Sequence, residues 1–361
     1  MFPETTLGAA LFGDLAHSVA QQVEDDALLT RTVCHARHRQ LAGTDAVGCA
    51  TITFVNRIAY DEFGLFHENA AEFGLPYPGP PHVRRESVEV EPGRRLSALV
   101  WGDGPPELVL IHGGAQNAHT WDTVALALDR PLLAVDLAGH GHSDDRASQS
   151  SASSRVDSLA SDMVKVIRAL APTAEAIVGM SLGGMTAICL ADQAPELVRR
   201  LLLVDVTPGV TAEKAKAITD FVNGPATFAD FDDILARTIE HNATRTEASL
   251  RRGILHNAIQ LDDGSWEWRH RRHDRSDDSR ESETVLDQGV LWDRLAAIAA
   301  PVLLVRGMRP QSVVDDADER EFCLRQPTGT VTQIAEAGHS VQGDTPVELA
   351  RIIEEFAIVR P

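Results

Sequence analysis

The sequence has few basic residues for its acidic content. Its 361 residues include 33 Lys and Arg against 53 Asp and Glu, a formal net charge of −20 at pH 7. Nucleic-acid affinity depends on Lys and Arg that neutralise phosphates, and attraction to anionic membranes depends on basic segments. This composition therefore argues against both kinds of partner. A surplus of acidic groups by itself favours solubility and indicates no particular partner.

Cysteines and long apolar runs are also scarce. No apolar run reaches the roughly 20 residues of a membrane-spanning helix, and the N-terminus lacks the basic and apolar regions of a signal peptide. His35 and His38 lie near Cys34, but no further ligands follow at zinc-like spacing, so we expect no metal site there. The few thiols show no C-x-x-C pattern and are expected to be free in a cytoplasmic protein: Cys34, Cys49, Cys189 and Cys323.

Short apolar runs that alternate with helical patterns make up most of the chain. The runs 108–111 (LVLI) and 132–135 (LLAV) are continuous, as in strands buried on both faces of a parallel sheet. Their alternation with helical patterns predicts a doubly wound α/β fold. Between 210 and 292 this alternation stops, and three helical patterns with one short alternating segment, 265–269, predict a mainly helical insertion.

A G-x-S-x-G motif stands between a predicted strand and a predicted helix. It reads Gly179-Met180-Ser181-Leu182-Gly183. A serine in this context lies on a strained turn with its hydroxyl exposed above the sheet, and the glycines let strand and helix cross closely. A serine hydroxyl is almost unionised at neutral pH and needs a neighbouring base. His339, which follows the last predicted strand, is the candidate base.

Four motifs occur in the order of a known family. They are His112-Gly113-Gly114, the loop 136–143 (DLAGHGHS), the serine motif, and Ala337-Gly338-His339. Together they resemble the α/β-hydrolase fold family over residues 83–361. The resemblance implies a mostly parallel, doubly wound sheet with an inserted helical cap. The expected organisation is an N-terminal extension with a Pro-rich connector (1–82), a core (83–209 and 293–361) and a cap (210–292).

The resemblance also assigns roles in the site. Ser181 would be the nucleophile, His339 the base, and the backbone N–H groups of Gly114 and Leu182 the oxyanion hole. The family usually carries its acid after the penultimate strand, but the loop 307–314 contains no carboxylate. Some members carry it after the strand that follows the nucleophile helix, where Asp205 stands. An Asp buried there unpaired would be costly, which favours Asp205. The alternative acids are Asp315 and Asp316.

The implied activity is hydrolysis of a carboxylic ester or lactone, a small-molecule substrate, through an acyl-enzyme and without a metal or cofactor. Carbon–carbon bond hydrolysis, perhydrolysis, and ligand binding without catalysis remain alternatives. We expect substrate contacts from one residue of the serine motif and from cap aromatics: Met180, Phe221, Trp266 and Trp268. Several apolar residues near positions 1–64 are unsuited to a free tail and predict packing against the domain or a homodimer interface: Phe54, Ile58, Tyr60, Phe63 and Phe66.

Overall fold

A mostly parallel eight-stranded sheet organises the protein. The computed structural model describes residues 57–146, 154–242, 244–270 and 287–357. The strand order is β1-β2-β4-β3-β5-β6-β10-β11; β1 pairs antiparallel with β2 and β2 with β4, and all later pairs are parallel. The strands are β1 (Val83–Glu91), β2 (Arg94–Trp101), β3 (Leu108–Ile111), β4 (Leu132–Val135), β5 (Ala176–Met180), β6 (Leu201–Val204), β10 (Val302–Gly307) and β11 (Thr330–Ile334).

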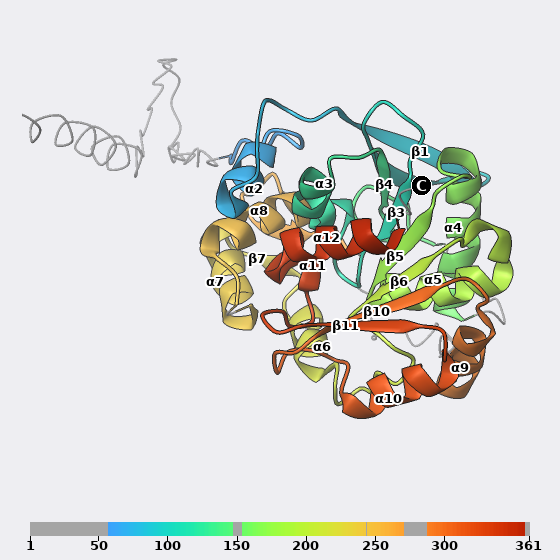
Figure 1. The fold of residues 1–361 in the computed structure, drawn as a ribbon. Helices are drawn as coiled ribbons and strands as arrows, with labels where there is room; N and C mark the ends of the chain where they lie inside the picture. The colour runs from blue at the N-terminus through green and yellow to red at the C-terminus, as the bar shows by residue number, and fades with distance from the viewer. Residues whose placement is uncertain (1–56, 147–153, 243, 271–286, 358–361) are drawn as a thin grey trace, which may run out of the picture. The chain divides into compact units, whose positions relative to one another are not determined.

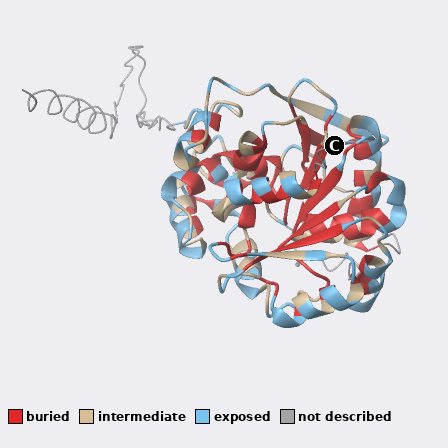
Figure 2. Ribbon diagram, viewed as in Figure 1, coloured by how far each residue is buried: buried red, intermediate tan, exposed pale blue. Residues whose placement is uncertain are grey.

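Helices cover both faces of this sheet, which confirms the predicted doubly wound arrangement (Figure 1). One face packs against α3 (Asp122–Leu128) and α12 (Pro346–Ala357). The other packs against α4 (Arg155–Leu170), α5 (Leu182–Gln193), α9 (Gln288–Ala297) and α10 (Asp316–Arg325). Because both faces are covered, the central strands are buried along their whole length, as Figure 2 shows.

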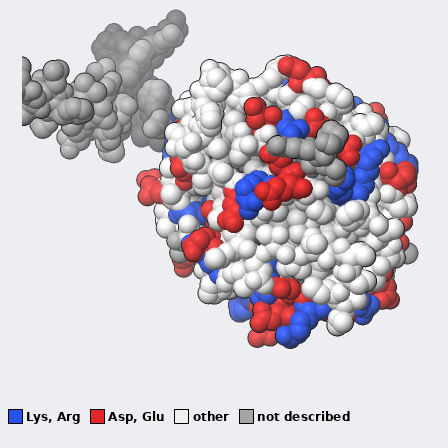
Figure 3. Space-filling model, viewed as in Figure 1, with Lys and Arg blue, Asp and Glu red and all other residues white. Residues whose placement is uncertain are grey.

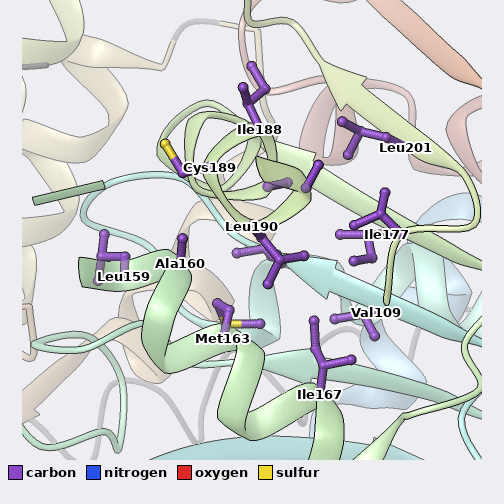
Figure 4. Close-up of a cluster of buried hydrophobic side chains, with 14 of the residues drawn as sticks. Val109, Leu159, Ala160, Met163, Ile167, Ile177, Ile188, Cys189, Leu190 and Leu201 are labelled. Atoms are coloured by element: carbon purple, nitrogen blue, oxygen red, sulfur yellow. The ribbon is translucent and has the colours of Figure 1, made fainter. Parts of the chain in front are cut away.

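Interlocking aliphatic side chains form the core between the sheet and α4 and α5. Val109 of β3 and Ile177 of β5 face Met163 and Ile167 of α4, with Leu190 of α5 between them (Figure 4). These residues are at most 1% exposed. Full burial of one such side chain is worth about 1.5–3 kcal/mol, so continuous apolar strands favour this fold strongly. On the outer surface shown in Figure 3, acidic and basic side chains are interspersed.

The predicted cap contains a small sheet in addition to helices. Its helices are α6 (Lys216–Val222), α7 (Phe231–His241) and α8 (Glu247–Asn257). The segment 265–269, predicted to contain a strand, holds β9 (Trp266–Trp268), which pairs with β7 (Thr227–Phe228) and β8 (Ala258–Gln260). β7 and β8 have only two and three residues. Strands this short show no periodicity, so the sequence did not indicate them.

The segment before the predicted core packs against both the core and the cap. Residues 58–361 form one compact unit, which includes α2 (Phe66–Phe73) and part of the extension predicted over 1–82. Phe66 is 1% exposed, with its ring centroid 4.9 Å from that of Trp101. Ile58 and Tyr60 join the apolar cluster of the cap. The packing role expected for these residues thus has structural support; Phe54 and the segment with Cys34, His35 and His38 lie outside the described residues.

Among the described residues, no helix is both long enough and apolar enough to cross a membrane. Cys189 and Cys323 are free thiols, as predicted.

Candidate active site

The serine motif forms a sharp turn between β5 and α5. Ser181 has φ 52° and ψ −117°, a left-handed conformation that is strained for a residue with a side chain. The strand and helix cross so closely that a Cβ on Gly179 would lie 2.6 Å from the Gly183 carbonyl oxygen. A Cβ on Gly183 would lie 2.3 Å from the Ile111 carbonyl oxygen. Glycine is therefore required on both sides of Ser181.

A buried carboxylate and an imidazole meet at the carboxyl ends of β6 and β11. Asp205 directly follows β6 and is fully buried, whereas His339 lies on the loop after β11 and is 8% exposed. The His339 Nδ1–H donates to Asp205 Oδ2 at 2.9 Å. This distance lies within the 2.6–3.2 Å expected for a base and the group that orients it. In the described part of the chain no hydrogen bond joins Ser181 to His339.

The loop that lacks the usual acid supplies hydrogen-bond donors to Asp205. The Gly307 N–H and the Ser312 hydroxyl donate to Oδ1 at 2.9 and 2.6 Å, and the Val313 N–H donates to Oδ2 at 3.1 Å. With His339, Asp205 thus accepts four hydrogen bonds (two on Oδ1 and two on Oδ2). These donors offset the cost of burying the carboxylate and fix its orientation toward His339.

The two alternative acids make other contacts. Asp315 is the N-cap of α10, and its carboxylate lies 2.8 Å from Lys214 Nζ. The hydrogen bond from Lys214 lowers the pKa of Asp315 to about 2. Asp316 is exposed, with its carboxylate 2.9 Å from a guanidinium nitrogen of Arg306. Neither residue is hydrogen-bonded to His339.

The predicted oxyanion donors lie on two segments that meet at Ser181. Leu182 begins α5, whose N-terminus carries the positive end of the helix dipole. Gly114 is exposed and has open space around its Cα. The neighbouring Gly113 lies against the nucleophile, because a Cβ there would be 3.2 Å from Ser181 Cβ. The Gly113 N–H donates to Gln116 Oε1 at 3.1 Å.

His112 supports this loop from below. It is fully buried, and its Nε2 accepts a hydrogen bond from the Leu137 N–H at 3.0 Å. Burial lowers the pKa of His112, so the ring is neutral and can accept that bond. This is the packing role expected for it from the sequence.

A cavity of about 160 Å³ lies between the cap and the loops that carry Gly114 and His339. Ala115 and Ser340, the neighbours of those two residues, line it, as do Phe221 and Trp268 of the cap. Trp266 does not line this cavity: it is 3% exposed and packs against Phe231 in the cap core. Met180 is 1% exposed and does not line it either, because Gly113 covers its sulfur. This cavity therefore gives no support to substrate contacts by Trp266 and Met180.

A buried ionic network forms one wall of the cavity. His119 Nδ1 donates to Asp122 Oδ2 at 2.9 Å and Nε2 to Glu62 Oε1 at 3.1 Å. Burial alone would lower the pKa of His119, but the two carboxylates outweigh it and raise the pKa to about 9. The ring of His256 from α8 stacks on His119 at 3.9 Å between centroids. Residues so distant in sequence show no common motif, so the sequence did not indicate this network.

Among the described residues, this network also contains the group of side chains that could ligate a metal ion. His119, Asp122 and His256 offer ligand atoms within 4.8 Å of one another. The two imidazole rings are stacked, with only 11° between their planes. The in-plane lone pairs of the two rings therefore lie in parallel planes and do not converge on one ion. His119 is protonated and holds two carboxylates. In this arrangement the cluster is suited to ion pairing and does not fit a metal.

Comparisons with known proteins agree with the geometry. A family model described as alpha/beta hydrolase fold matches residues 106–346. The chain is 43% identical over 301 residues to the esterase Rv0045c of Mycobacterium tuberculosis, covering 81% of this chain and 94% of that protein. A crystal structure of that esterase aligns with a TM-score of 0.70 and 40% identity, covering 83% of this chain and 99% of the other. A 3-hydroxybutyrate-oligomer hydrolase of Cupriavidus necator is 29% identical, covering 71% of this chain and 90% of that protein.

Proposed function

Because this chain belongs to the α/β-hydrolase fold family and is an ester hydrolase, we propose that it cleaves carboxylic esters through an acyl-enzyme on a Ser181–His339–Asp205 triad. The observation that carries the proposal is the 2.9 Å hydrogen bond from His339 to the buried Asp205, at the sheet edge where the strained Ser181 turn also lies. A histidine that only stabilises a loop does not require a buried carboxylate as its partner. A histidine that is hydrogen-bonded to a buried carboxylate and lies beside a nucleophile elbow has the arrangement of a general base.

In the proposed reaction Ser181 Oγ attacks the ester carbonyl carbon while His339 Nε2 accepts the hydroxyl proton. The carbonyl oxygen becomes an oxyanion, which the N–H groups of Gly114 and Leu182 stabilise. Collapse of this intermediate breaks the carbon–oxygen bond, and His339 delivers its proton to the departing alcohol. Water then attacks the acyl-enzyme with His339 again as base, releasing the acid and restoring Ser181.

Asp205 has an orienting role in this scheme. Its Oδ2 holds the proton on His339 Nδ1, which leaves Nε2 able to accept the proton of Ser181. The imidazolium formed during the reaction is stabilised by the same carboxylate. The three donors from the end of β10 and the loop after it keep the carboxylate in place throughout, so no reorganisation is needed in the transition state.

Covalent labelling tests the nucleophile. We expect a fluorophosphonate to modify Ser181 and no other residue, located by mass spectrometry of the digested protein. Ser181→Ala should abolish labelling and lower kcat for p-nitrophenyl butyrate by about 10⁴–10⁶-fold. Ser161→Ala, which removes an exposed hydroxyl from α4, is the matched control and should behave as wild type. Undiminished turnover by Ser181→Ala would contradict the mechanism.

A further inference from the structure

The cavity beside the proposed triad is cationic in an acidic protein. Its lining contains Arg245, Arg252 and the protonated His119, and no Asp or Glu. The chain as a whole has a net charge of −20. A positively charged cavity attracts anionic ligands, even where the protein as a whole has a negative net charge.

Two of these three cations are already neutralised within the protein. Arg252 forms an ion pair with Glu72 and lies 3.6 Å from Glu68. His119 is held between Asp122 and Glu62. Their charges are therefore used to fasten the cap to α2 and the core, and they add little attraction for a ligand.

Arg245 is different, because no carboxylate in the described part of the chain lies within ion-pair distance of it. One guanidinium nitrogen donates to the hydroxyl of Ser249, while Nε is buried and has no acceptor among the described residues. Burial lowers the pKa of Arg245, although the negative charges of Asp344 and Glu72 partly oppose this effect. A half-buried cation with no carboxylate in direct contact destabilises the folded protein, and a bound anion would reduce that cost.

The position of Arg245 relates it to the proposed chemistry. It reaches from the cap to α11 (Val341–Asp344), since a Cβ on Gly343 would lie 2.6 Å from its Nη1. α11 directly follows His339 and Ser340. Amide side chains that can bind a carboxylate or a carbonyl surround the same cavity, among them Asn242, Asn257 and Gln342. Ser181 and His339 do not line this cavity, but a group bound at Arg245 would share it with Ala115 and Ser340, the neighbours of Gly114 and His339.

We propose that Arg245 binds a carboxylate of the substrate, so that the preferred substrates are half-esters of dicarboxylic acids or similar esters with a free carboxylate. This inference rests on the proposed function, because it names the substrate class of that site. The planar guanidinium suits carboxylate better than any other common anion-binding side chain, through two parallel hydrogen bonds.

The test compares anionic and neutral esters of equal shape. The probes are the mono-p-nitrophenyl esters of succinate, adipate and suberate, each paired with the analogue in which a primary amide replaces the free carboxylate. After subtraction of spontaneous hydrolysis, we expect kcat/KM for the best anionic ester to exceed that of its amide by at least about tenfold. Arg245→Gln should lower this ratio by about 10–100-fold, and Arg245→Lys should restore part of it. Arg251→Gln, at an exposed position on helix α8, which follows Arg245 in the chain, should leave the ratio unchanged.

Binding measured without turnover separates this inference from the triad. In the Ser181→Ala background, calorimetry should show tighter binding of the anionic ester than of the amide, and the added Arg245→Gln change should abolish the difference. If neither ester is hydrolysed but this difference persists, the triad is wrong and the carboxylate site stands. If neutral esters are hydrolysed through Ser181 and no chain length shows a carboxylate preference in rate or binding, the carboxylate site is wrong.

Discussion

At the scale of single residues, the hydrogen bonds around Asp205 make its replacement informative. Asp205→Asn keeps the size of the side chain but replaces one acceptor oxygen by an amide NH₂. That NH₂ must face existing donors and favours the wrong tautomer of His339, so we expect kcat to fall by about 10⁴-fold. Steady-state kinetics with p-nitrophenyl butyrate measures this, and a thermal melt checks that the variant is folded.

The control variants for this prediction lie at the start of α10. Asp315→Asn and Asp316→Asn remove contacts with Lys214 and Arg306 but none with His339, so kcat should stay within about twofold of wild type. The reverse pattern, an active Asp205→Asn and a crippled Asp315→Asn or Asp316→Asn, would move the acid to α10.

The residues of the site differ in how far the sequence could predict them. Ser181 and His339 belong to short motifs whose spacing reflects strand ends, so local sequence was sufficient to nominate them. Asp205 was inferred from a missing carboxylate elsewhere together with an acid after an apolar strand. Arg245 could not be nominated, because its significance lies in a guanidinium Nε that has no acceptor among the described residues, which depends on three-dimensional contacts.

At the scale of elements, the ionic network joins three segments. Glu62 comes from the stretch before α2, His119 from the 3₁₀ helix Ala118–Trp121, and His256 from α8 of the cap. Arg85 of β1 pairs with Glu62 and with Asp136, which follows β4, so these pairs add two further segments. Periodicity predicts where each element begins and ends, but it contains no information about such pairings. This is why the attachment of α2 and the cap to the core was not predicted in detail.

The network predicts a loss of stability at alkaline pH. The pKa of His119 is about 9 in the folded protein against an ordinary value of 6.5. The stabilisation that protonated His119 gives the folded state is therefore complete below about pH 6.5 and disappears as the pH rises through 9. Glu62, Asp122 and Arg85 face this ring together with the neutral His256. This shift in the pKa of His119 corresponds to about 3 kcal/mol in the free energy of unfolding.

Guanidinium unfolding at pH 6 and pH 9 measures this change. We expect the free energy of unfolding of the wild type to fall by about 1–3 kcal/mol from pH 6 to pH 9. The His119→Gln variant should be less stable at pH 6, and its free energy of unfolding should fall markedly less. Equal pH dependence in the two proteins would assign the alkaline loss to other groups.

At the scale of the whole molecule, residues 58–74 belong to the hydrolase unit although they precede the predicted core. A chain beginning at Leu75 loses the Phe66 side chain from the core and leaves Arg252 without Glu72. Loss of a buried Phe costs about 3–5 kcal/mol, so the melting temperature should fall by about 10 °C.

A chain beginning at Ile58 is the matched control for the chain beginning at Leu75, because it keeps the contacts of residues 58–74 with the rest of the unit. It should melt about 10 °C above the chain beginning at Leu75. If the chain beginning at Leu75 is equally stable, monodisperse and fully active, residues 58–74 have no structural role.

The carboxylate at the end of β6 has a consequence for how such chains are classified. With Asp205 as the proposed acid, the end of β10 and the loop after it contribute two backbone N–H groups and the hydroxyl of Ser312. Backbone donors persist through most changes of side chain, so this part of the chain can hold Asp205 in place without contributing an acid of its own. A survey that searches only this loop for an acid would count the chain among catalytically dead members. Surveys of the family should therefore examine the residue after the sixth strand before a missing acid is interpreted as lost activity.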